Sequence, residues 1–572
     1  MFRKNEAHRQ VSMFSAEEWL PEKLQKQLQA SWAETFYNEV FCRIDETRFA
    51  ALYSSTMSRP NVPVNVLVSL EILKSGFGWN DEELYEQVCF NLQVRHALGL
   101  RDLSAGMFTL RTLYNFRRRI HEYTLESGCN LMQMVFEDVT DAQLDAVSLA
   151  TGWQRMDSTQ VLSNLAHWTR LELLVGVLQT VYQQLTPDQQ ASWQPRAAPY
   201  LGKRPHQICY RIRGKAQTAH LLTIGQLLAD LEAELLTTQP PSAALPLLQR
   251  VLAEQYIREK DLPIQLRPAK EVASDSLQSP YDEDATYRVK NGKTYRGGYV
   301  INVSETVNPE NPVQLVTDVQ VEPNHTDDAQ LLKQSLDNQI ARGVAVNQIT
   351  TDGGYTGPTS DAACDTHKVE LRATHMRGGR SAPYHWGWEA YTWEVDCGGL
   401  PCRVTCPQGQ CTALSTTTGQ RFVAHFDAAR CAECPFRDSM CRIEWRKRVG
   451  PTLYVKRTMI DAARRRACLH PEDTPIRAVV EATVREVKHP FPGGKMPVRG
   501  LIRTRMVIYG AALMTNLRRL HRYAQAKAES ASATDSDQPL AILSTLVSRL
   551  TQRYVPQILH LARRVPSRPL II

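Results

Sequence analysis

Segments that look like β-strands stand on both sides of a long helical stretch, and this interruption restricts the possible folds more than any other feature. A short run ends near Asp157, and residues 162–265 then repeat leucine and valine at helical spacing. Turn-bounded runs rich in β-branched residues return around Tyr287, Gly297 and Val313. We therefore expect the helical stretch to be an insertion into a domain built on a sheet.

The elements that follow extend this pattern. Residues 326–342 predict a helix, and residues 344–351 predict a short strand that ends on Asp352, where a glycine lets the backbone turn sharply. With the helix that carries Glu481, the order is that of an RNase H-like core, with Asp157, Asp352 and Glu481 at its open edge. A turn or a helix N-cap would use Asp157-Ser-Thr equally well, so that motif is weak alone.

The segment from Arg477 to Lys488 predicts a helix that presents one carboxylate among three cations. At about 100° per residue, Arg477, Glu481 and Lys488 fall within an arc of roughly 40°, and Arg485 lies beside them. The neighbouring arc is apolar, so this helix can pack on a sheet with Glu481 at the edge of the contact. A solvated charged face would show the same charge spacing.

Positive charge is concentrated in the last third of the chain. The net charge is +7, but residues 430–522 hold 21 Lys and Arg against 8 Asp and Glu, an excess of 13, so the remainder is acidic. A polyanionic substrate favours such a region, because each neutralised phosphate releases counterions.

The N-terminal segment predicts short helices joined by tight turns. Asn80 is expected to cap one of them with Glu83 as its capping-box partner. The last helix of the series carries Arg117, Arg118 and Arg119. This arrangement is compatible with a DNA reader of the helix-turn-helix kind and equally with a helical bundle that has a solvated basic end.

Cysteines cluster between Asp352 and Glu481. The chain has no apolar run near 18 residues and no apolar segment at its N-terminus, so we expect a cytoplasmic protein with reduced thiols. Seven of the 13 cysteines fall within 45 residues: Cys397, Cys402, Cys406, Cys411, Cys431, Cys434 and Cys441. Cys406-x4-Cys411 and Cys431-x2-Cys434 have the spacing of a four-thiolate zinc site, with Cys441 and Cys402 as competing ligands. Reduced cysteines without a metal are the alternative.

Three motifs together carry a family resemblance. Asp157-Ser-Thr, Asp352-Gly-Gly-Tyr and Arg477-x3-Glu481-x6-Lys488 resemble the DDE transposases of bacterial insertion sequences, in the branch with a Y-R-E-K-type signature. Residues 62–120 resemble the InsH-type N-terminal domain of that branch, and the similarity covers roughly residues 60–520. Thr474 stands where the signature has tyrosine, so the stacking role of that tyrosine beside the DNA end does not carry over.

The resemblance implies a site for two Mg²⁺ ions, with Mn²⁺ as a substitute. Asp157 would bridge both ions, and Asp352 and Glu481 would each complete one site. The resemblance and the basic pattern imply DNA contacts from seven cations, which are Arg477, Lys488, Arg485, Lys495, Arg117, Arg118 and Arg119. The Cys-rich segment would add a structural Zn²⁺ ion.

The predicted fold is an α/β RNase H-like core, a mixed sheet with flanking helices, joined to an all-α N-terminal domain. The expected divisions are a helical DNA-binding domain at 1–125, a connecting helix at 126–150, a catalytic domain at 151–520 with insertions at 162–265 (helical) and 397–445 (Cys-rich), and a linker and C-terminal helix at 521–572.

The implied partners are double-stranded DNA, as transposon ends and target, and a second copy in a homodimer on that DNA. We expect no membrane association and a location at the bacterial nucleoid. Two other functions remain open: an RNase H-like nuclease without strand transfer, and an inactive zinc-containing DNA-binding derivative.

Overall fold

The computed structural model describes residues 1–534 except 11–14, 55–59, 105, 107, 239–241, 260–261, 291, 377–384, 397–398 and 418–420. Cys397 and the helix that we expected at 540–564 lie outside the described residues. None of the described helices is long and apolar enough to span a membrane.

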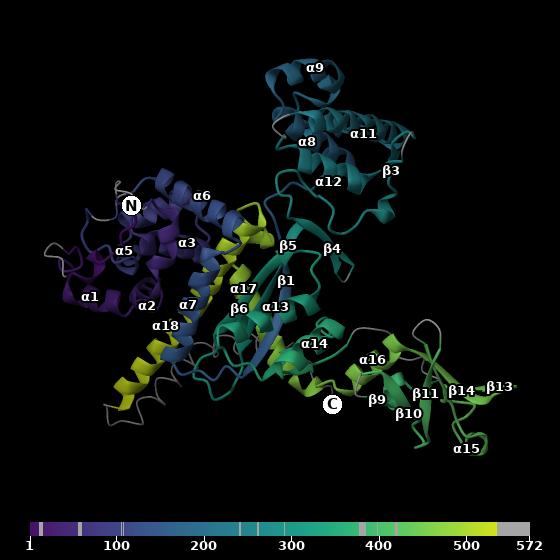
Figure 1. The fold of residues 1–572 in the computed structure, drawn as a ribbon. Coiled ribbons are helices and arrows are strands. Elements are labelled where there is room, and N and C mark those ends of the chain that lie inside the picture. Colours follow the sequence, from purple (N-terminus) through teal and green to yellow (C-terminus); the bar gives the residue numbers. More distant parts are fainter. Residues whose placement is uncertain are drawn as a thin grey trace, which may run out of the picture.

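A mixed sheet of six strands occupies the centre of the molecule (Figure 1). Its strands are β1 (Trp153–Leu162), β4 (Thr286–Lys290), β5 (Lys293–Thr306), β6 (Val316–Pro323), β7 (Gln348–Thr351) and β8 (Glu370–Ala373). They run in the order β4-β5-β1-β7-β8, and β6 also pairs with β5. β1 is antiparallel to β5 and parallel to β7, and β7 is parallel to β8.

The position of Asp157 differs from the strand end that we expected. β1 pairs with β5 from Gln154 to Leu162, so Asp157 lies in the middle of the strand. Asp352 does follow directly after β7, as predicted. The difference arises because pairing with β5, which is far away in sequence, extends β1 through polar residues that by themselves suggest a turn.

Helices pack against the central sheet, as predicted. α13 (Asp328–Ala341) follows β6, and α14 (Pro358–His367) connects β7 to β8. α17 (Thr474–Lys488) contacts β1, and Val480 and Val487 from its apolar stripe are fully buried. The helix and its buried face are therefore confirmed.

Helices are the main regular elements of the described part of the N-terminal region. Its α-helices are α1 (Glu22–Gln29), α2 (Trp32–Glu39), α3 (Val64–Phe77), α4 (Asp81–Phe90), α5 (Leu92–Ala97), α6 (Leu110–Ser127) and α7 (Leu131–Ala146). Asn80 caps α4 as predicted, since its side chain accepts from Glu83 N and the Glu83 carboxylate accepts from Asn80 N, both at 2.8 Å.

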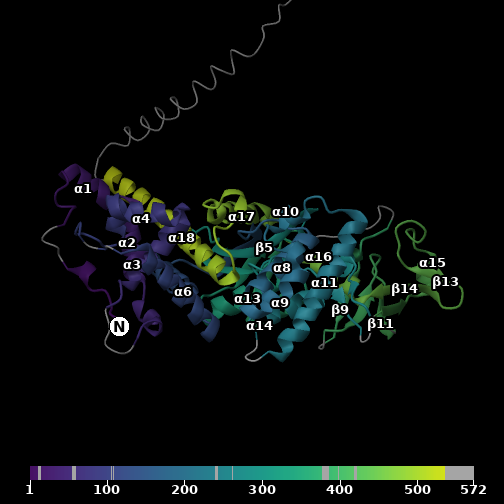
Figure 2. The same ribbon diagram turned by 90° about the horizontal axis from the view of Figure 1, so that it is seen from above.

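A long helix joins the N-terminal region to the sheet. α18 (Leu501–Thr534) runs beside α3 (Figure 2), and one continuous hydrophobic core includes residues from both helices and from β5. The two helices approach closely at Gly76, which has no side chain. A Cβ at this position would lie 2.1 Å from Met514 Cγ. α18 also continues to Thr534, past residue 521, where we expected the C-terminal linker and helix segment to begin.

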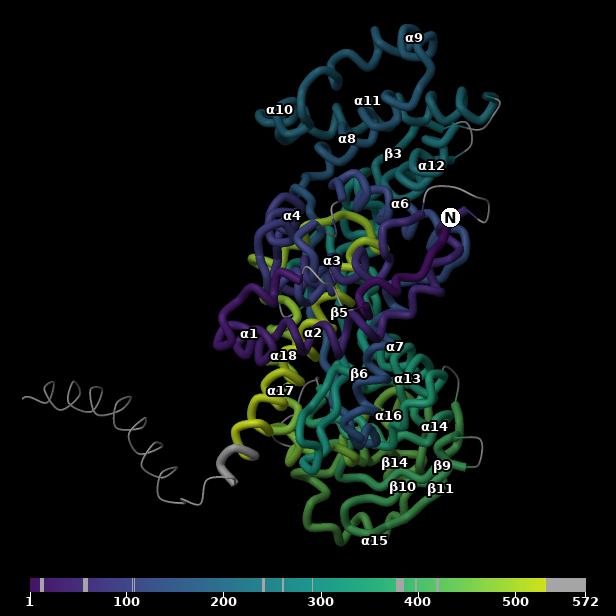
Figure 3. Tube along the Cα trace, turned by 90° about the vertical axis from the view of Figure 1, so that its left-hand side faces the viewer, coloured from purple at the N-terminus to yellow at the C-terminus, as the bar shows by residue number. Residues whose placement is uncertain are grey.

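The two insertions lie at opposite ends of the molecule (Figures 1 and 3). The first contains α8 (Arg170–Gln183), α9 (Pro187–Ala197), α10 (Pro205–Cys209), α11 (Gly214–Thr237), α12 (Leu245–Gln255) and the short pair β2 (Tyr256–Ile257) and β3 (Gln265–Leu266). It has a hydrophobic core of its own. The helical character that we predicted for residues 162–265 is thus present, within shorter limits.

The Cys-rich segment lies within a second sheet, which we call the inserted sheet. It consists of β9 (Thr392–Val395), β10 (Pro401–Thr405), β11 (Cys411–Thr417), β12 (Arg421–His425), β13 (Glu444–Arg446) and β14 (Gly450–Lys456). All its pairings are antiparallel, in the order β13-β14-β12-β11-β10-β9. α15 (Ala428–Ala432) precedes β13, and α16 (Arg457–Ala467) leads back to the central sheet.

Candidate active site

Arg477 connects two of the three predicted acids. It projects from the first half of α17 and donates from Nη2 to Asp157 Oδ2 at 3.1 Å and from Nη1 to Glu481 Oε1 at 2.7 Å. Asp157 is 8% exposed, whereas the Glu481 side chain is 52% exposed. The helix therefore brings Glu481 to the strand that carries Asp157, and a shared guanidinium holds the two carboxylates.

Asp352 directly follows the neighbouring strand, β7, and is buried. Its Oδ1 accepts from Gly354 N at 2.8 Å, which fixes the carboxylate at the end of β7. Gly353 has no space for a side chain, because a Cβ there would lie 2.1 Å from the His375 carbonyl oxygen. The glycine that we expected to approach a ligand thus packs against neighbouring backbone.

Negative charge is concentrated in the candidate active site. Burial raises the pKa of Asp157, the nearby Asp352 raises it further, and Arg477 opposes both. Burial disfavours the charge on Arg477, but Asp157, Asp352 and Glu481 together raise the pKa of its guanidinium. A cation is thus strongly favoured among these three carboxylates.

The structure adds a fourth carboxylate that sequence reasoning missed. Asp328, at the start of α13, is 4% exposed and accepts from Ser158 Oγ at 3.0 Å. It also lies 3.3 Å from Arg288 and 3.7 Å from Lys290 of β4. An acidic residue at the start of a helix is usually explained by its favourable interaction with the helix dipole. The sequence therefore contained no separate indication that Asp328 belongs to this site.

Lys488, at the other end of α17, lies beside β1. Its Nζ donates to Thr159 Oγ1 at 2.9 Å and to the Gln160 carbonyl at 3.0 Å. Burial and the nearby Lys293 lower its pKa. Lys488 thus contacts β1 at Thr159, two residues after Asp157. Arg485 and Lys495 are exposed.

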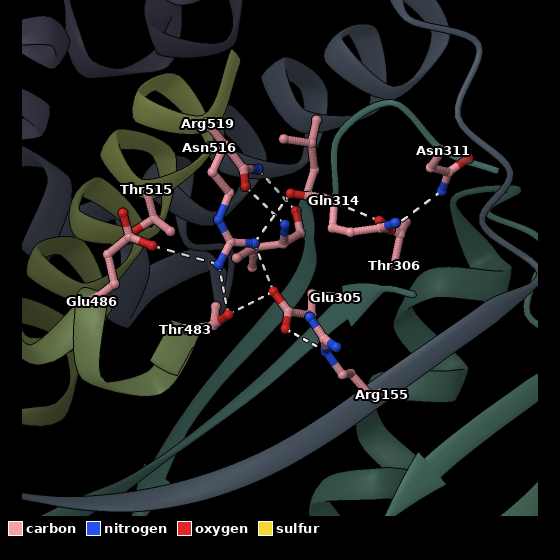
Figure 4. A network of polar contacts seen from close by, with 12 residues as sticks. Arg155, Glu305, Thr306, Asn311, Gln314, Thr483, Glu486, Thr515, Asn516 and Arg519 are labelled. Atoms are coloured by element: carbon pink, nitrogen blue, oxygen red, sulfur yellow. Dashed lines mark hydrogen bonds and ion pairs between the residues drawn. The ribbon is translucent and has the colours of Figure 1, made fainter. Parts of the chain in front are cut away.

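A buried polar network fixes α17 against the sheet (Figure 4). Glu305 of β5 is fully buried and accepts from Arg155 Nε at 2.6 Å, from Arg519 Nη1 at 2.6 Å and from Thr483 Oγ1 at 2.7 Å. Arg155 lies two residues before Asp157, and Thr483 lies two residues after Glu481. Glu305 therefore ties together the elements that carry both acids.

The three N-terminal arginines predicted to contact DNA differ in how strongly they are held by other side chains. Arg117 donates to Glu71 at 2.7 Å and to both carboxylate oxygens of Asp81 at 2.8 and 2.9 Å. Although burial opposes it, hydrogen bonds from Arg117 and Lys74 lower the pKa of Asp81 to about 2. Arg118 is exposed and pairs with Glu122 at 2.8 Å.

Arg119 lies 5.2 Å from the ring of Tyr53. A cavity of about 410 Å³ brings Arg117 and Arg118 together with Lys495, which is distant in sequence. Three of the predicted DNA contacts thus share one cavity, although Arg117 is already held in an internal ion pair.

Four thiols line a small cavity of about 100 Å³ beside the inserted sheet: Cys406, Cys431, Cys434 and Cys441. Burial and the three neighbouring thiols raise the pKa of Cys431 to about 11. Cys411, at the start of β11, is exposed and does not line this cavity. Across the described ranges, no three His, Cys, Asp or Glu side chains are arranged so that they could hold a metal ion as they stand.

Two protein-family models match the chain. A transposase DDE domain model matches residues 405–521, and a transposase domain model named DUF772 matches residues 25–119. No curated protein matches the chain. The first match includes Arg477, Glu481 and Lys488, whereas Asp157 and Asp352 lie outside both. The resemblance inferred from the motifs is confirmed: two segments of the chain match transposase domain models, and these matches are consistent with a DDE transposase of an insertion sequence.

Proposed function

We propose that the chain is a DNA transposase that binds the ends of an insertion sequence, cleaves the phosphodiester backbone and joins the 3′-hydroxyl ends to target DNA. One observation carries the proposal. Arg477 lies among Asp157, Asp352 and Glu481, two of which it contacts directly. The three acids come from widely separated parts of the chain. If Glu481 belonged only to a solvated helix face, it would have no reason to share a cation with the buried Asp157.

The strand order supports the further proposal of an RNase H-like core. Along the path β6-β5-β1-β7-β8, the first three strands alternate in direction and the last three are parallel. Asp157 lies on the central strand, Asp352 follows the adjacent parallel strand, and Glu481 comes from the helix that packs on them. These positions support a site that the three acids share.

The donor set fits divalent cations in charge and in chemistry. Carboxylate oxygens are the ligands that Mg²⁺ and Mn²⁺ prefer, and the charges of Asp157, Asp352 and Glu481 raise the pKa of the Arg477 guanidinium among them, which favours a cation at this position. We propose that Asp157, Asp352 and Glu481 would hold two such ions. Glu481, which is half exposed, would have to turn from Arg477 toward the aspartates. Bound ions would activate the attacking oxygen and stabilise the leaving one.

The chain's own cations would hold the DNA. When Glu481 turns to a metal ion, Arg477 can present its planar guanidinium to a phosphate beside the scissile bond. Lys488 can leave Thr159 and Gln160 to contact the next phosphate as a point charge. A homodimer on double-stranded DNA follows from the need to join two transposon ends.

Replacing Asp157 with Asn tests the proposal. We expect cleavage of a terminal-repeat duplex in Mg²⁺ to fall to background while duplex binding persists. Asp327→Asn, which alters a nearby exposed acid, is the matched control and should cleave normally. Cleavage by the Asp157→Asn chain would refute the assignment of this site.

A strand-transfer assay distinguishes the other functions. Joining of a precleaved 3′ end to a target plasmid is expected of a transposase. Cleavage without joining would favour an RNase H-like nuclease. Binding without either reaction would favour an inactive DNA-binding derivative.

We also propose that Cys406, Cys431, Cys434 and Cys441 hold a structural zinc ion, because these four thiols face one cavity. The Cys431 thiol now donates to Oε1 of Gln410, which lines the same cavity, at 3.6 Å, and would give up this contact to bind the metal. Of the five predicted ligands, Cys411 is left out. Metal analysis should find about one zinc per chain in the wild type and in Cys411→Ser, and little in Cys434→Ser. Equal zinc in both variants would refute this ligand set.

A further inference from the structure

A groove on the inserted sheet gathers positive charge far from the candidate active site. It is a cavity of about 620 Å³ along β12, β14 and the start of α16. Four cations line it, Arg421, Arg442, Arg446 and Lys456, against the single acid Glu444. Figure 1 shows the inserted sheet well apart from α17, with α16 between them.

Two of these cations lie side by side and have no counter-ion among the described residues. Arg421 of β12 and Lys456 of β14 are directly opposite each other in the antiparallel register. Both are exposed, and neither forms an ion pair with an acid in the described part of the chain. Like charges in directly opposite positions destabilise a sheet. An anion that binds here would remove that cost.

Aromatic rings flank the charged pair. Tyr454 lies two residues before Lys456, so both side chains project from the same face of β14. The Tyr454 side chain is 49% exposed, and the Arg446 guanidinium lies 5.4 Å from its ring. On the other side of the groove, Arg442 lies 4.8 Å from the ring of Trp388. Cations interleaved with accessible ring faces are the pattern of nucleic-acid binding surfaces.

The adjoining turn extends the charge beyond the groove. Lys447 and Arg448, between β13 and β14, are both exposed. A linear polyanion with evenly spaced charges could contact the groove and this turn together, whereas a small anion would use only one of them. The pattern therefore favours a nucleic-acid backbone.

We propose that this groove binds the sugar–phosphate backbone of duplex DNA as a second contact surface, separate from the candidate active site. The inference rests on the proposed function, since it assumes that the chain acts on DNA. The groove recognises phosphates through Arg421 and Lys456, and Tyr454 packs against the sugar or an exposed base. It would hold DNA that extends beyond the site of cleavage.

Salt-dependent binding of the full-length chain tests this surface. The affinity for a labelled duplex is measured by fluorescence anisotropy in EDTA at several salt concentrations, for the wild type and for Arg421→Ala/Lys456→Ala. Loss of two phosphate contacts should reduce the slope of log affinity against log salt by about 1.8. The matched control is Lys203→Ala/Lys215→Ala, which removes two exposed cations from the helical insertion.

The outcomes separate the two proposals. A reduced slope in the groove variant alone supports the surface, and a thermal midpoint no lower than that of the wild type shows that folding is intact. An unchanged slope, or an equal change in the control variant, overturns the inference while the cleavage proposal stands. Failure of the wild type to bind any duplex would overturn the proposed function itself.

Discussion

The central sheet and the inserted sheet both have six strands and both carry many cations, but they use these cations differently. In the central sheet, Arg155 contacts the buried Glu305, and Arg477 of the helix packed on this sheet contacts Asp157 and Glu481. In the inserted sheet, Arg421 and Lys456 face solvent without an acidic partner among the described residues.

The difference shows that charge content alone does not identify a DNA-binding surface. The excess of 13 positive charges in residues 430–522 includes cations of both kinds. A cation held in a buried ion pair cannot reach a phosphate without leaving its partner unpaired, which is costly. Substitutions in the central sheet should therefore reduce stability, and substitutions in the inserted sheet should reduce DNA affinity.

The largest effect is expected for Glu305→Ala. This change leaves two arginines, Arg155 and Arg519, buried beside an empty position. The free energy of unfolding should fall by about 3–5 kcal/mol, measured by urea denaturation. Cleavage should fall as well, because Glu305 holds Thr483 of α17 against the sheet.

Glu444→Ala in the inserted sheet is the matched control. Its partner Arg446 is half exposed, so the unfolding free energy should change by less than about 1 kcal/mol. Similar losses for the two variants would contradict the contrast between the sheets.

Arg117 and Arg118 extend the contrast to the N-terminal helices. Arg117→Ala should lower the unfolding free energy by about 3 kcal/mol, because Glu71 and Asp81 lose their shared partner. Arg118→Ala removes an exposed pair with Glu122 and should change it by less than about 0.5 kcal/mol.

DNA affinity provides the second measurement for this pair. At a temperature where both variants are folded, Arg118→Ala should weaken duplex binding more than Arg117→Ala. The reverse order would show that Arg117 leaves its ion pair to contact DNA.

The smallest effect is a pH dependence at Asp157. Its folded-state pKa is raised, mainly by burial, so the folded chain retains this proton more readily than the unfolded chain does. The free energy of unfolding therefore falls as pH rises from the ordinary aspartate range to the raised value. In EDTA, Asp157→Asn should be more stable than the wild type above that window and nearly equal below it. Thermal unfolding from pH 3 to 8 checks this, and a pH-independent difference would contradict it.

Local patterns explain which expectations were accurate. The helix from Thr474 to Lys488 was predictable because the spacing of its valines marks a buried face. The Asn80 cap was predictable because capping involves residues three apart. The location of Asp352 after β7 was predictable because a glycine turn follows a β-branched run.

Long-range contacts explain the rest. The extent of β1 past Asp157 depends on pairing with β5, more than 130 residues away. The role of Asp328 depends on Ser158, and that of Glu305 depends on Arg519, 214 residues along the chain. Among the cysteines, spacing favoured Cys411 as a ligand, but its position on β11 directs it away from the cavity that the other four share.

The sequence by itself determined the helix with Arg477, Glu481 and Lys488, the helical character of the first insertion and the resemblance to DDE transposases. Each of these depends on residues that are close together in the chain or on a set of short motifs taken together. Only the tertiary structure decided which acids meet at Arg477, which cations are buried in ion pairs and which remain open to DNA. The physical reason is that the burial and ion pairing of a side chain depend on the residues that surround it in space. Its charge alone does not identify those residues.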